Sequence, residues 1–355
     1  QVSFKLVTLL AILPLPAAVF YCLRRLRYEE PAPILGAALS LAFLFMAENH
    51  MWGGNIASTL AGEFSYGISF ILAILLTGRI YSDAPRGRSL IANSFIEALI
   101  AFSNGYPILH TGIVTSFFLL RGRCTRYILC MHALAFGLIA FWILPLIRFS
   151  GWNAPFAHWW SFQTPLELVP PLLWPSIAGG MLLLASHARR FFHLLTRRQS
   201  STGPESSNDP ELYLWWQLGT ALLGFCLAPY FGLVDVRFLP FAQISVVMLG
   251  AVGWSKLISR LPCPRICLVV FTAGVMVLSF TRSITVESWI RWNYSGMENK
   301  PVWESFAETN RFLEGSENSP RVFYEQSELI NGVGSARAFE MLPYFSGRST
   351  LAGLY

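Results

Sequence analysis

Long apolar runs, separated by very few charged residues, constrain the fold of this chain more than any other feature. Its 355 residues are 54% hydrophobic and 13% charged, with a mean hydropathy of +0.48, whereas a soluble domain carries about 25% charged residues. A soluble protein seldom has so large an apolar share, because its surface needs polar cover. The composition therefore argues against a soluble enzyme, a disordered chain and a nucleic-acid-binding protein, and it indicates an all-α, multi-pass membrane protein.

Apolar runs recur along the chain, and each predicts a transmembrane helix. Several are shorter than the ~20 residues that a perpendicular helix needs, so we expect tilted or broken helices. Proline predicts the kinks, which we expect at Pro14, Pro16, Pro170, Pro171 and Pro175. The predicted spans are about ten, at residues 4–22, 32–47, 64–78, 90–103, 107–120, 127–147, 166–187, 212–233, 239–255 and 266–282.

The basic residues between these runs predict the orientation of the chain. Five alternate loops hold 16 Lys and Arg residues, whereas the four opposite loops hold only Arg148 and Arg237. Because cytoplasmic loops are rich in Lys and Arg, we expect the five basic loops in the cytoplasm and the protein in the plasma (inner) membrane. The five loops are residues 23–31, 79–89, 121–126, 188–211 and 256–265.

The end of the sequence differs from the rest in charge. Residues 1–282 carry a formal net charge of +9, and residues 283–355 carry −3. This contrast predicts a transmembrane helical domain at 1–282, followed by an extracytoplasmic domain at 283–355. A helical pattern near 301–314 and a short apolar strand at 321–324 predict an α/β fold there. We expect both termini to be truncated, because the sequence begins beside an apolar run and ends inside a folded segment.

The polar stretch at 47–66, between the second and third spans, is the first candidate site. It carries Glu48, His50, Asn55 and Glu63, with three glycines and no Lys or Arg. Carboxylates beside an apolar boundary can act as bases or hold a metal, and glycine lets a ligand approach the backbone. Glu48 and Glu63 are therefore candidate catalytic carboxylates, and His50 and Asn55 candidate cavity-lining residues. A tight external turn is the alternative.

Two ionisable residues flank the next external turn. Glu97 and His110 lie on the two sides of the turn at 104–107, and the two helices of this hairpin are expected to hold them at a similar depth. An ionisable group at membrane depth is costly and is therefore a candidate for function. The two residues could line a cavity and relay a proton, or they could form a purely structural pair.

The outer basic residues predict a phosphate site. A guanidinium binds phosphate in a fork, so Arg237 is a candidate for binding a lipid phosphate; a surface pair between Asp235 and Arg237 is the alternative. Arg148 and His158 belong to an outer loop rich in Trp and could also meet a lipid headgroup. An aromatic belt at the membrane interface explains most of that loop equally well.

Several of these segments resemble one family. They are WGGNIASTLAGEFSY at 52–66, NGYP at 104–107, RFLPF at 237–241, RVFYEQ at 321–326 and MLPYFSGRSTLAGLY at 341–355. In this order they resemble prokaryotic multi-pass membrane proteins related to 6-pyruvoyl-tetrahydropterin synthase, a group that is similar to the GT-C glycosyltransferase superfamily. The resemblance covers most of the chain, and the stretch at 52–66 is its most specific part.

The resemblance implies a GT-C-like fold and the transfer of a sugar outside the cytoplasm. The donor would be a polyprenyl-phosphate-linked sugar among the membrane lipids, and the acceptor a saccharide, a lipid or a protein. The catalytic Asp or Glu of such enzymes usually lies in the first external loop, which we expect upstream of Gln1, so the catalytic base stays unknown. No nucleotide-binding motif is present. No metal site is assigned, and the only cofactor considered is a divalent cation, which the mechanism does not require.

Two other functions fit the same sequence. A transporter or flippase of a lipid-linked saccharide would bind a lipid phosphate in the same way but would need no base. Internal repeats are typical of transporters, and the sequence shows no convincing one. A non-catalytic component of envelope assembly would use residues 283–355 for docking.

Overall fold

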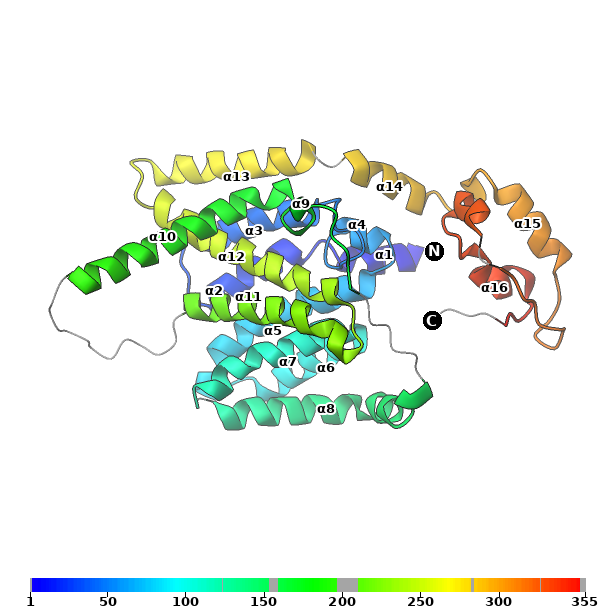
Figure 1. Ribbon diagram of the computed structural model, residues 1–355, viewed down its shortest axis with the longest axis horizontal. Coiled ribbons are helices and arrows are strands. Elements are labelled where there is room, and N and C mark those ends of the chain that lie inside the picture. Colours follow the sequence, from blue (N-terminus) through cyan, green and yellow to red (C-terminus); the bar gives the residue numbers. More distant parts are fainter. Residues whose placement is uncertain are drawn as a thin grey trace. The chain divides into compact units, whose positions relative to one another are not determined.

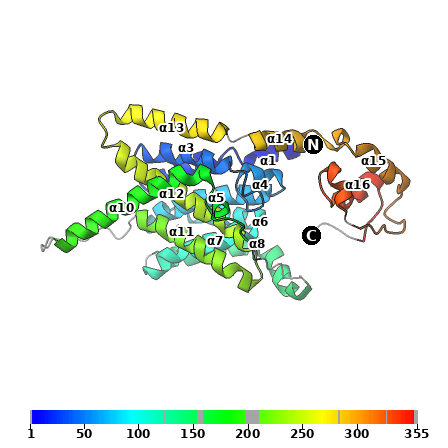
Figure 2. The same ribbon diagram turned by 45° about the horizontal axis from the view of Figure 1, so that its top comes forward.

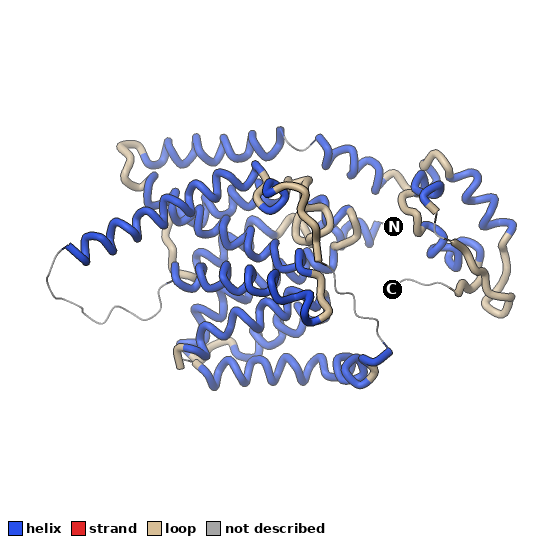
Figure 3. Tube along the Cα trace, in the orientation of Figure 1, coloured by secondary structure: helices blue, strands red, loops and turns tan. Residues whose placement is uncertain are grey.

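The computed structural model describes residues 2–122, 124–152, 159–196, 210–281, 284–325 and 327–351. The chain divides into two compact units, Gln1–Val286 and Glu287–Tyr355. Figure 3 shows that the described residues form helices and connecting loops, with no strand among them. The all-helical fold that the sequence predicts for the membrane domain is confirmed.

The first unit is a bundle of α-helices whose members lie alongside one another (Figures 1 and 2). Its helices are α1 (Val2–Leu10), α2 (Leu15–Arg25), α3 (Ala32–Leu44), α4 (Ile56–Leu60), α5 (Phe64–Asp83), α6 (Leu90–Ser103), α7 (Gly105–Leu120), α8 (Thr125–Arg148), α9 (Pro165–Leu168), α10 (Trp174–Thr196), α11 (Pro210–Leu227), α12 (Leu239–Ile258) and α13 (Pro264–Thr281). Short 3-10 turns include η3 (Pro171–Leu173) and η5 (Asp235–Phe238).

Six helical segments in the described part of the chain are long and apolar enough to cross a membrane. They are Lys5–Arg25, Phe64–Arg86, Thr125–Arg148, Pro210–Phe231, Asp235–Ile258 and Pro264–Thr281. The prediction of about ten spans is therefore not supported. Helices α3, α6 and α7 have only 13, 14 and 16 residues. At a rise of about 1.5 Å per residue they reach roughly 20–24 Å, which is less than the ~30 Å of a hydrocarbon core.

Proline breaks two of the predicted spans, as the sequence predicted. Pro14 precedes α2 and separates it from α1. Pro170 and Pro171 interrupt the predicted span at 166–187, which the structure divides into α9, η3 and α10. Proline has no N–H for the helical ladder, and its ring clashes with the preceding turn. The breaks therefore follow directly from the sequence.

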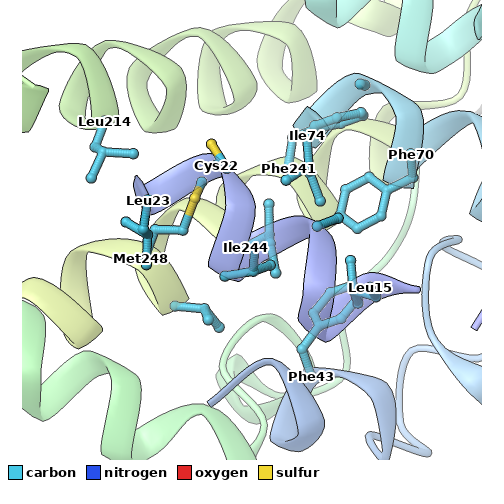
Figure 4. Packing of buried hydrophobic residues seen from close by; sticks show 14 of the residues in the cluster. Leu15, Cys22, Leu23, Phe43, Phe70, Ile74, Leu214, Phe241, Ile244 and Met248 are labelled. Atoms are coloured by element: carbon cyan, nitrogen blue, oxygen red, sulfur yellow. The ribbon is translucent and has the colours of Figure 1, made fainter. Parts of the chain in front are cut away.

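Helix α12 is the central helix of this unit. The most apolar window of its span is 89% buried, against 22% for α8 and 11% for α13. It packs against α3, α10 and α11. Figure 4 shows the apolar core around it, to which α2, α3, α5, α11 and α12 contribute Leu15, Cys22, Leu23, Phe43, Phe70, Ile74, Leu214, Phe241, Ile244 and Met248. The apolar, exposed faces of α8 and α13 are those expected of helices in contact with lipid.

Small residues bring α10 and α12 into close contact. Gly179 of α10 faces Gly250 and Gly253 of α12, and Gly250 also faces Ser176. A Cβ atom at any of these glycines would overlap a carbonyl oxygen of the other helix. Glycine is common at such crossings in membrane proteins, because it lets two backbones approach and maximises their van der Waals contact.

The second unit is small and mostly helical. It contains most of α14 (Ile284–Tyr294), then α15 (Trp303–Phe312) and α16 (Leu342–Ser346), and its core includes Phe306, Val333 and Ala338. The helix predicted near 301–314 is present as α15. The strand predicted at 321–324 is reduced to one parallel bridge, between Val322 and Thr350. A strand needs a ladder of partners to persist, so the α/β prediction is not supported by the described residues of this unit.

Candidate functional site

The loop between α3 and α5 is held together by buried side chains that bond to backbone. Asn55 caps α4: its Oδ1 accepts a hydrogen bond from Ser58 N at 2.7 Å, and its Nδ2 donates to the Met46 carbonyl at 3.1 Å. Ser58 Oγ donates to the Asn49 carbonyl at 2.9 Å and accepts from Gly53 N at 3.0 Å. Asn55 and Ser58 are 1% and 0% exposed. Asn55 therefore shapes this loop.

We expect Asn55→Ala to destabilise the folded protein by about 1–3 kcal/mol. The substitution removes a helix cap and leaves a buried N–H and a buried carbonyl without partners. Thermal unfolding of the purified protein in detergent measures the effect. Glu48→Ala is the matched control, since Glu48 is exposed on the same loop and accepts a hydrogen bond from the neighbouring Ala47 N, at 3.1 Å. Equal unfolding temperatures for the two variants would contradict the structural role of Asn55.

A glycine of the same loop serves the packing of the protein rather than the approach of a ligand. Gly53 has a φ of 110°, a conformation that favours glycine. A Cβ atom there would overlap the ring of Tyr66. The hydroxyl of Tyr66 in turn donates to the Arg237 carbonyl at 2.6 Å. Gly53 thus lets the loop close over the aromatic residue that positions the backbone of Arg237.

The structure brings together Glu63 and Arg237, which the sequence placed in two separate candidate sites. Arg237 Nη2 lies 2.5 Å from Glu63 Oε1, and the side chains are 16% and 21% exposed, respectively. Arg237 Nη1 is buried and has no hydrogen-bond partner among the residues that the structure describes. Buried donors are normally satisfied. The pair therefore combines a carboxylate, a guanidinium and one spare N–H group that could bind an anion.

Asp235 has a different role from the one considered for it. It is 2% exposed; its Oδ1 accepts from Val236 N at 2.7 Å and its Oδ2 from Trp160 N at 3.0 Å. The carboxylate therefore fixes the turn before α12 and ties it to the loop after α8. The surface pair between Asp235 and Arg237 is not what the structure shows, because Arg237 pairs with Glu63.

Aromatic contacts join the segments around this pair. The ring of Trp52 meets those of Trp160 and Phe162 edge to face, with centroids 6.5 and 5.9 Å apart. Tyr106 Oη accepts from Val234 N at 3.0 Å. The stretch at 52–66 and the turns at 104–107 and 234–239 therefore converge at one place, although they are far apart in the sequence.

The predicted pairing of Glu97 with His110 is wrong. Glu97 Oε1 lies 2.5 Å from His132 Nδ1, and His132 Nε2 lies 2.9 Å from Thr115 Oγ1. His110 instead stacks on Phe241, with ring centroids 4.0 Å apart. A similar depth on two helices does not fix the direction in which each side chain points, and His110 points to α12. His132 was missed, although an ionisable residue inside the apolar run at 127–147 is itself a signal.

The remaining predicted residues lie at the surface or beyond the described part of the chain. Glu48 and His50 are exposed on the loop, and Arg148 is exposed at the end of α8, with its guanidinium 5.8 Å from the Phe149 ring centre. His158 lies outside the described residues. Of the candidate carboxylates and cations, the structure thus joins Glu63 with Arg237.

The sequence leaves open a divalent cation, and the charges of the Glu63–Arg237 pair indicate how well such an ion would fit there. No group of three or more His, Cys, Asp or Glu side chains that could hold a metal occurs among the residues the structure describes. Hard cations bind to oxygen-rich sites with excess negative charge. The carboxylate of Glu63 is compensated by Arg237, so these residues suit an anionic ligand better than a metal ion.

Comparison with known proteins identifies the family. Residues 1–295 match the family described as 6-pyruvoyl-tetrahydropterin synthase related domain, a membrane protein. None of the curated proteins and none of the solved structures compared with the chain matches it. The matched region contains the convergent segments at 52–66, 104–107 and 237–241. The resemblance drawn from those segments is confirmed at the level of the family, and the chain belongs to the 6-pyruvoyl-tetrahydropterin synthase related membrane proteins.

Proposed function

We propose that this protein is a GT-C-like membrane glycosyltransferase that takes a sugar from a polyprenyl-phosphate carrier at the outer face of the plasma membrane. The observation that carries the proposal is the Glu63–Arg237 pair with its spare Nη1 group. The pair lies beside two apolar helices. Its guanidinium is the group that a lipid phosphate requires, and its partly exposed carboxylate is the group that a hydroxyl acceptor requires.

The position of the pair suits a lipid headgroup. Glu63 immediately precedes α5, and Arg237 lies in η5, just before α12. The rings of Phe70 and Phe241, which lie within the first two turns of α5 and α12, meet with centroids 4.8 Å apart, so the two helices begin at the same end of the bundle. Their amino-terminal ends also favour a negative charge. The basic-loop pattern predicts that this end faces outward.

The proposed chemistry divides between the two side chains. Arg237 would bind the phosphate of the donor and stabilise the oxyanion that develops as the bond between the anomeric carbon and the phosphate oxygen breaks. The phosphate would release Glu63 from Arg237. Glu63 would then take the proton of the acceptor hydroxyl while the oxygen of that hydroxyl bonds to the anomeric carbon. Glu48 is the other candidate for this base.

One feature of the pair favours an alternative. The carboxylate of Glu63 is already paired with a guanidinium and must leave it before it can take a proton, whereas a transporter or flippase of a lipid-linked saccharide needs only the guanidinium. A non-catalytic envelope protein could likewise use the pair as a binding site. These functions differ from a transferase in a measurable way, because they leave the glycosyl bond intact.

Sealed vesicles that contain the full chain and a radiolabelled polyprenyl-phosphate sugar test the proposal. We expect the label to pass from the organic-soluble lipid to a water-soluble or protein-bound acceptor supplied as a cell-envelope extract. Vesicles that contain Arg237→Ala should retain the label on the lipid. Movement of intact labelled lipid between the leaflets, without loss of its sugar, would overturn the transferase and support the flippase.

A further inference from the structure

A pocket in the second unit lies outside the candidate site described above. It has a volume of about 240 Å³ and lies between α15, with the residues that follow it, and α16. This volume is somewhat below the ~300–1,000 Å³ of typical sites for drug-sized ligands, so the pocket suits one small ring. It is lined by Trp303, Ala307, Asn310, Arg311, Glu314 and Phe345.

The pocket is built by one face of α15. Trp303, Ala307 and Asn310 recur at intervals of four and three residues, which places them on the same side of α15, and Glu314 follows the end of that helix. Phe306 points into the core of the unit instead and is 3% exposed. Ala307 has the smallest side chain of the six and leaves space beside Trp303. A hollow on this face is therefore a consequence of the sequence of α15.

Two aromatic rings meet at one side of the pocket. The rings of Trp303 and Phe345 have centroids 5.6 Å apart and planes inclined at 66°. Trp303 and Phe345 are both partly exposed. Aromatic faces carry negative charge density, and they attract the weakly positive C–H groups of an aliphatic ring. A ligand with one apolar face fits this corner.

The polar part of the pocket contains an acceptor without a donor. Asn310 is 3% exposed; its Nδ2 donates to the Phe306 carbonyl at 2.7 Å, and its Oδ1 has no hydrogen-bond partner in the described part of the chain. A buried carbonyl oxygen without a donor costs roughly 1–3 kcal/mol, so such groups usually have an explanation. The missing partner is a donor, such as a hydroxyl group, that a ligand would bring.

The charges at the rim select against ionic ligands. Arg311 and Glu314 have opposite charges and line the same pocket. A phosphate would meet the carboxylate and the unpaired carbonyl oxygen, and a quaternary ammonium would meet the guanidinium. A neutral molecule with several hydroxyls satisfies every group, because hydroxyls donate to Glu314 and Asn310 and accept from Arg311.

We propose that this pocket binds a single pyranose unit of a saccharide, with its C–H face on the corner of Trp303 and Phe345 and a hydroxyl donating to Asn310 Oδ1. The proposal goes beyond the transferase function and does not depend on it, since it is carried by the residues of the second unit alone.

Ligand-observed NMR on the full chain in detergent tests this site. The probes are methyl pyranosides of glucose, galactose, mannose and N-acetylglucosamine. We expect saturation transfer to at least one of them, and about ten-fold weaker binding in Asn310→Leu, which removes the acceptor, and in Ala307→Leu, which fills the space. Glu308→Gln, an exposed change on the same helix, is the control and should bind as the wild type does.

The stability of the variants separates a binding role from a structural one. Asn310→Leu removes an unpaired buried carbonyl, so its thermal unfolding temperature should equal or exceed that of the wild type while its binding falls. The proposal is overturned by an absence of transfer to all four glycosides, or by unchanged binding in both variants. The assay involves no lipid phosphate, so it can fail while the transferase proposal stands, and the reverse also holds.

Discussion

Arg237→Ala is expected to lower the affinity of the protein for polyprenyl phosphate by about 10–100-fold. The guanidinium would make charge-assisted hydrogen bonds to the phosphate, and each such bond contributes about 1.5–3 kcal/mol; a loss of 1.4 kcal/mol corresponds to about ten-fold in affinity. The affinity of Arg237→Lys should lie between those of the wild type and Arg237→Ala, because lysine keeps the positive charge but cannot bind the phosphate through the two N–H groups of a guanidinium. Binding of a short-chain, water-soluble polyprenyl phosphate to the protein in nanodiscs measures the effect.

Arg148→Ala is the matched control for this substitution. Arg148 is the other basic residue of the loops that are predicted to face outward, and it is exposed at the end of α8. Its removal changes the net charge equally but leaves the Glu63–Arg237 pair intact. A wild-type affinity in Arg237→Ala, or an equal loss in Arg148→Ala, would remove the specific role of Arg237.

Loss of folding must be separated from loss of binding. Arg237→Ala leaves the carboxylate of Glu63 partly buried without its partner, which is destabilising by itself. The double variant Glu63→Gln with Arg237→Ala removes that charge and should recover stability but not phosphate binding. Glu63→Gln alone should keep or increase the affinity for the phosphate, since it frees the guanidinium, while it abolishes transfer if Glu63 is the base.

The sequence predicts the helices well because each apolar run is visible by itself. The number of membrane spans is overestimated, because α3, α6 and α7 are apolar but short, and because the predicted span at 166–187 is broken at Pro170 and Pro171. The central position of α12 is not predictable in the same way. In a soluble helix the polar face reveals which side is exposed, but lipid-facing helices such as α13 are as apolar as buried ones.

The candidate site shows where reasoning from the sequence reaches its limit. Glu63 and Arg237 are 174 residues apart, and each was singled out because ionisable residues are rare at a membrane boundary. Their pairing depends on which helices pack side by side, which no local pattern encodes. The same limit explains why Glu97 was paired with His110 instead of His132.

The pocket of the second unit was missed for a different reason. Its aromatic and polar residues are of ordinary types at ordinary helical spacing, and the pattern predicts only the helix α15. The hollow is lined by α15 residues such as Ala307 together with Phe345, which comes more than thirty residues later in the chain. Packing between elements creates such a site, so a single sequence carries no signal for it.

Gly179→Ala and Gly253→Ala are expected to destabilise the first unit by about 3 kcal/mol or more. The added Cβ of each variant would overlap a carbonyl oxygen of the facing helix, and backbone cannot move aside as a flexible side chain can. Overpacking alone costs roughly 1–3 kcal/mol, and separation of α10 from the central helix α12 would add lost van der Waals contact.

Gly180→Ala is the matched control, because it adds the same methyl group to the adjacent position of α10 where nothing lies within 4 Å. The stability of this variant should change by less than about 1 kcal/mol, and the change should be an increase because alanine stabilises a helix more than glycine does. Thermal unfolding in detergent, followed by tryptophan fluorescence, compares the variants. If Gly179→Ala and Gly180→Ala unfold at the same temperature, the close crossing of α10 and α12 at these glycines is contradicted.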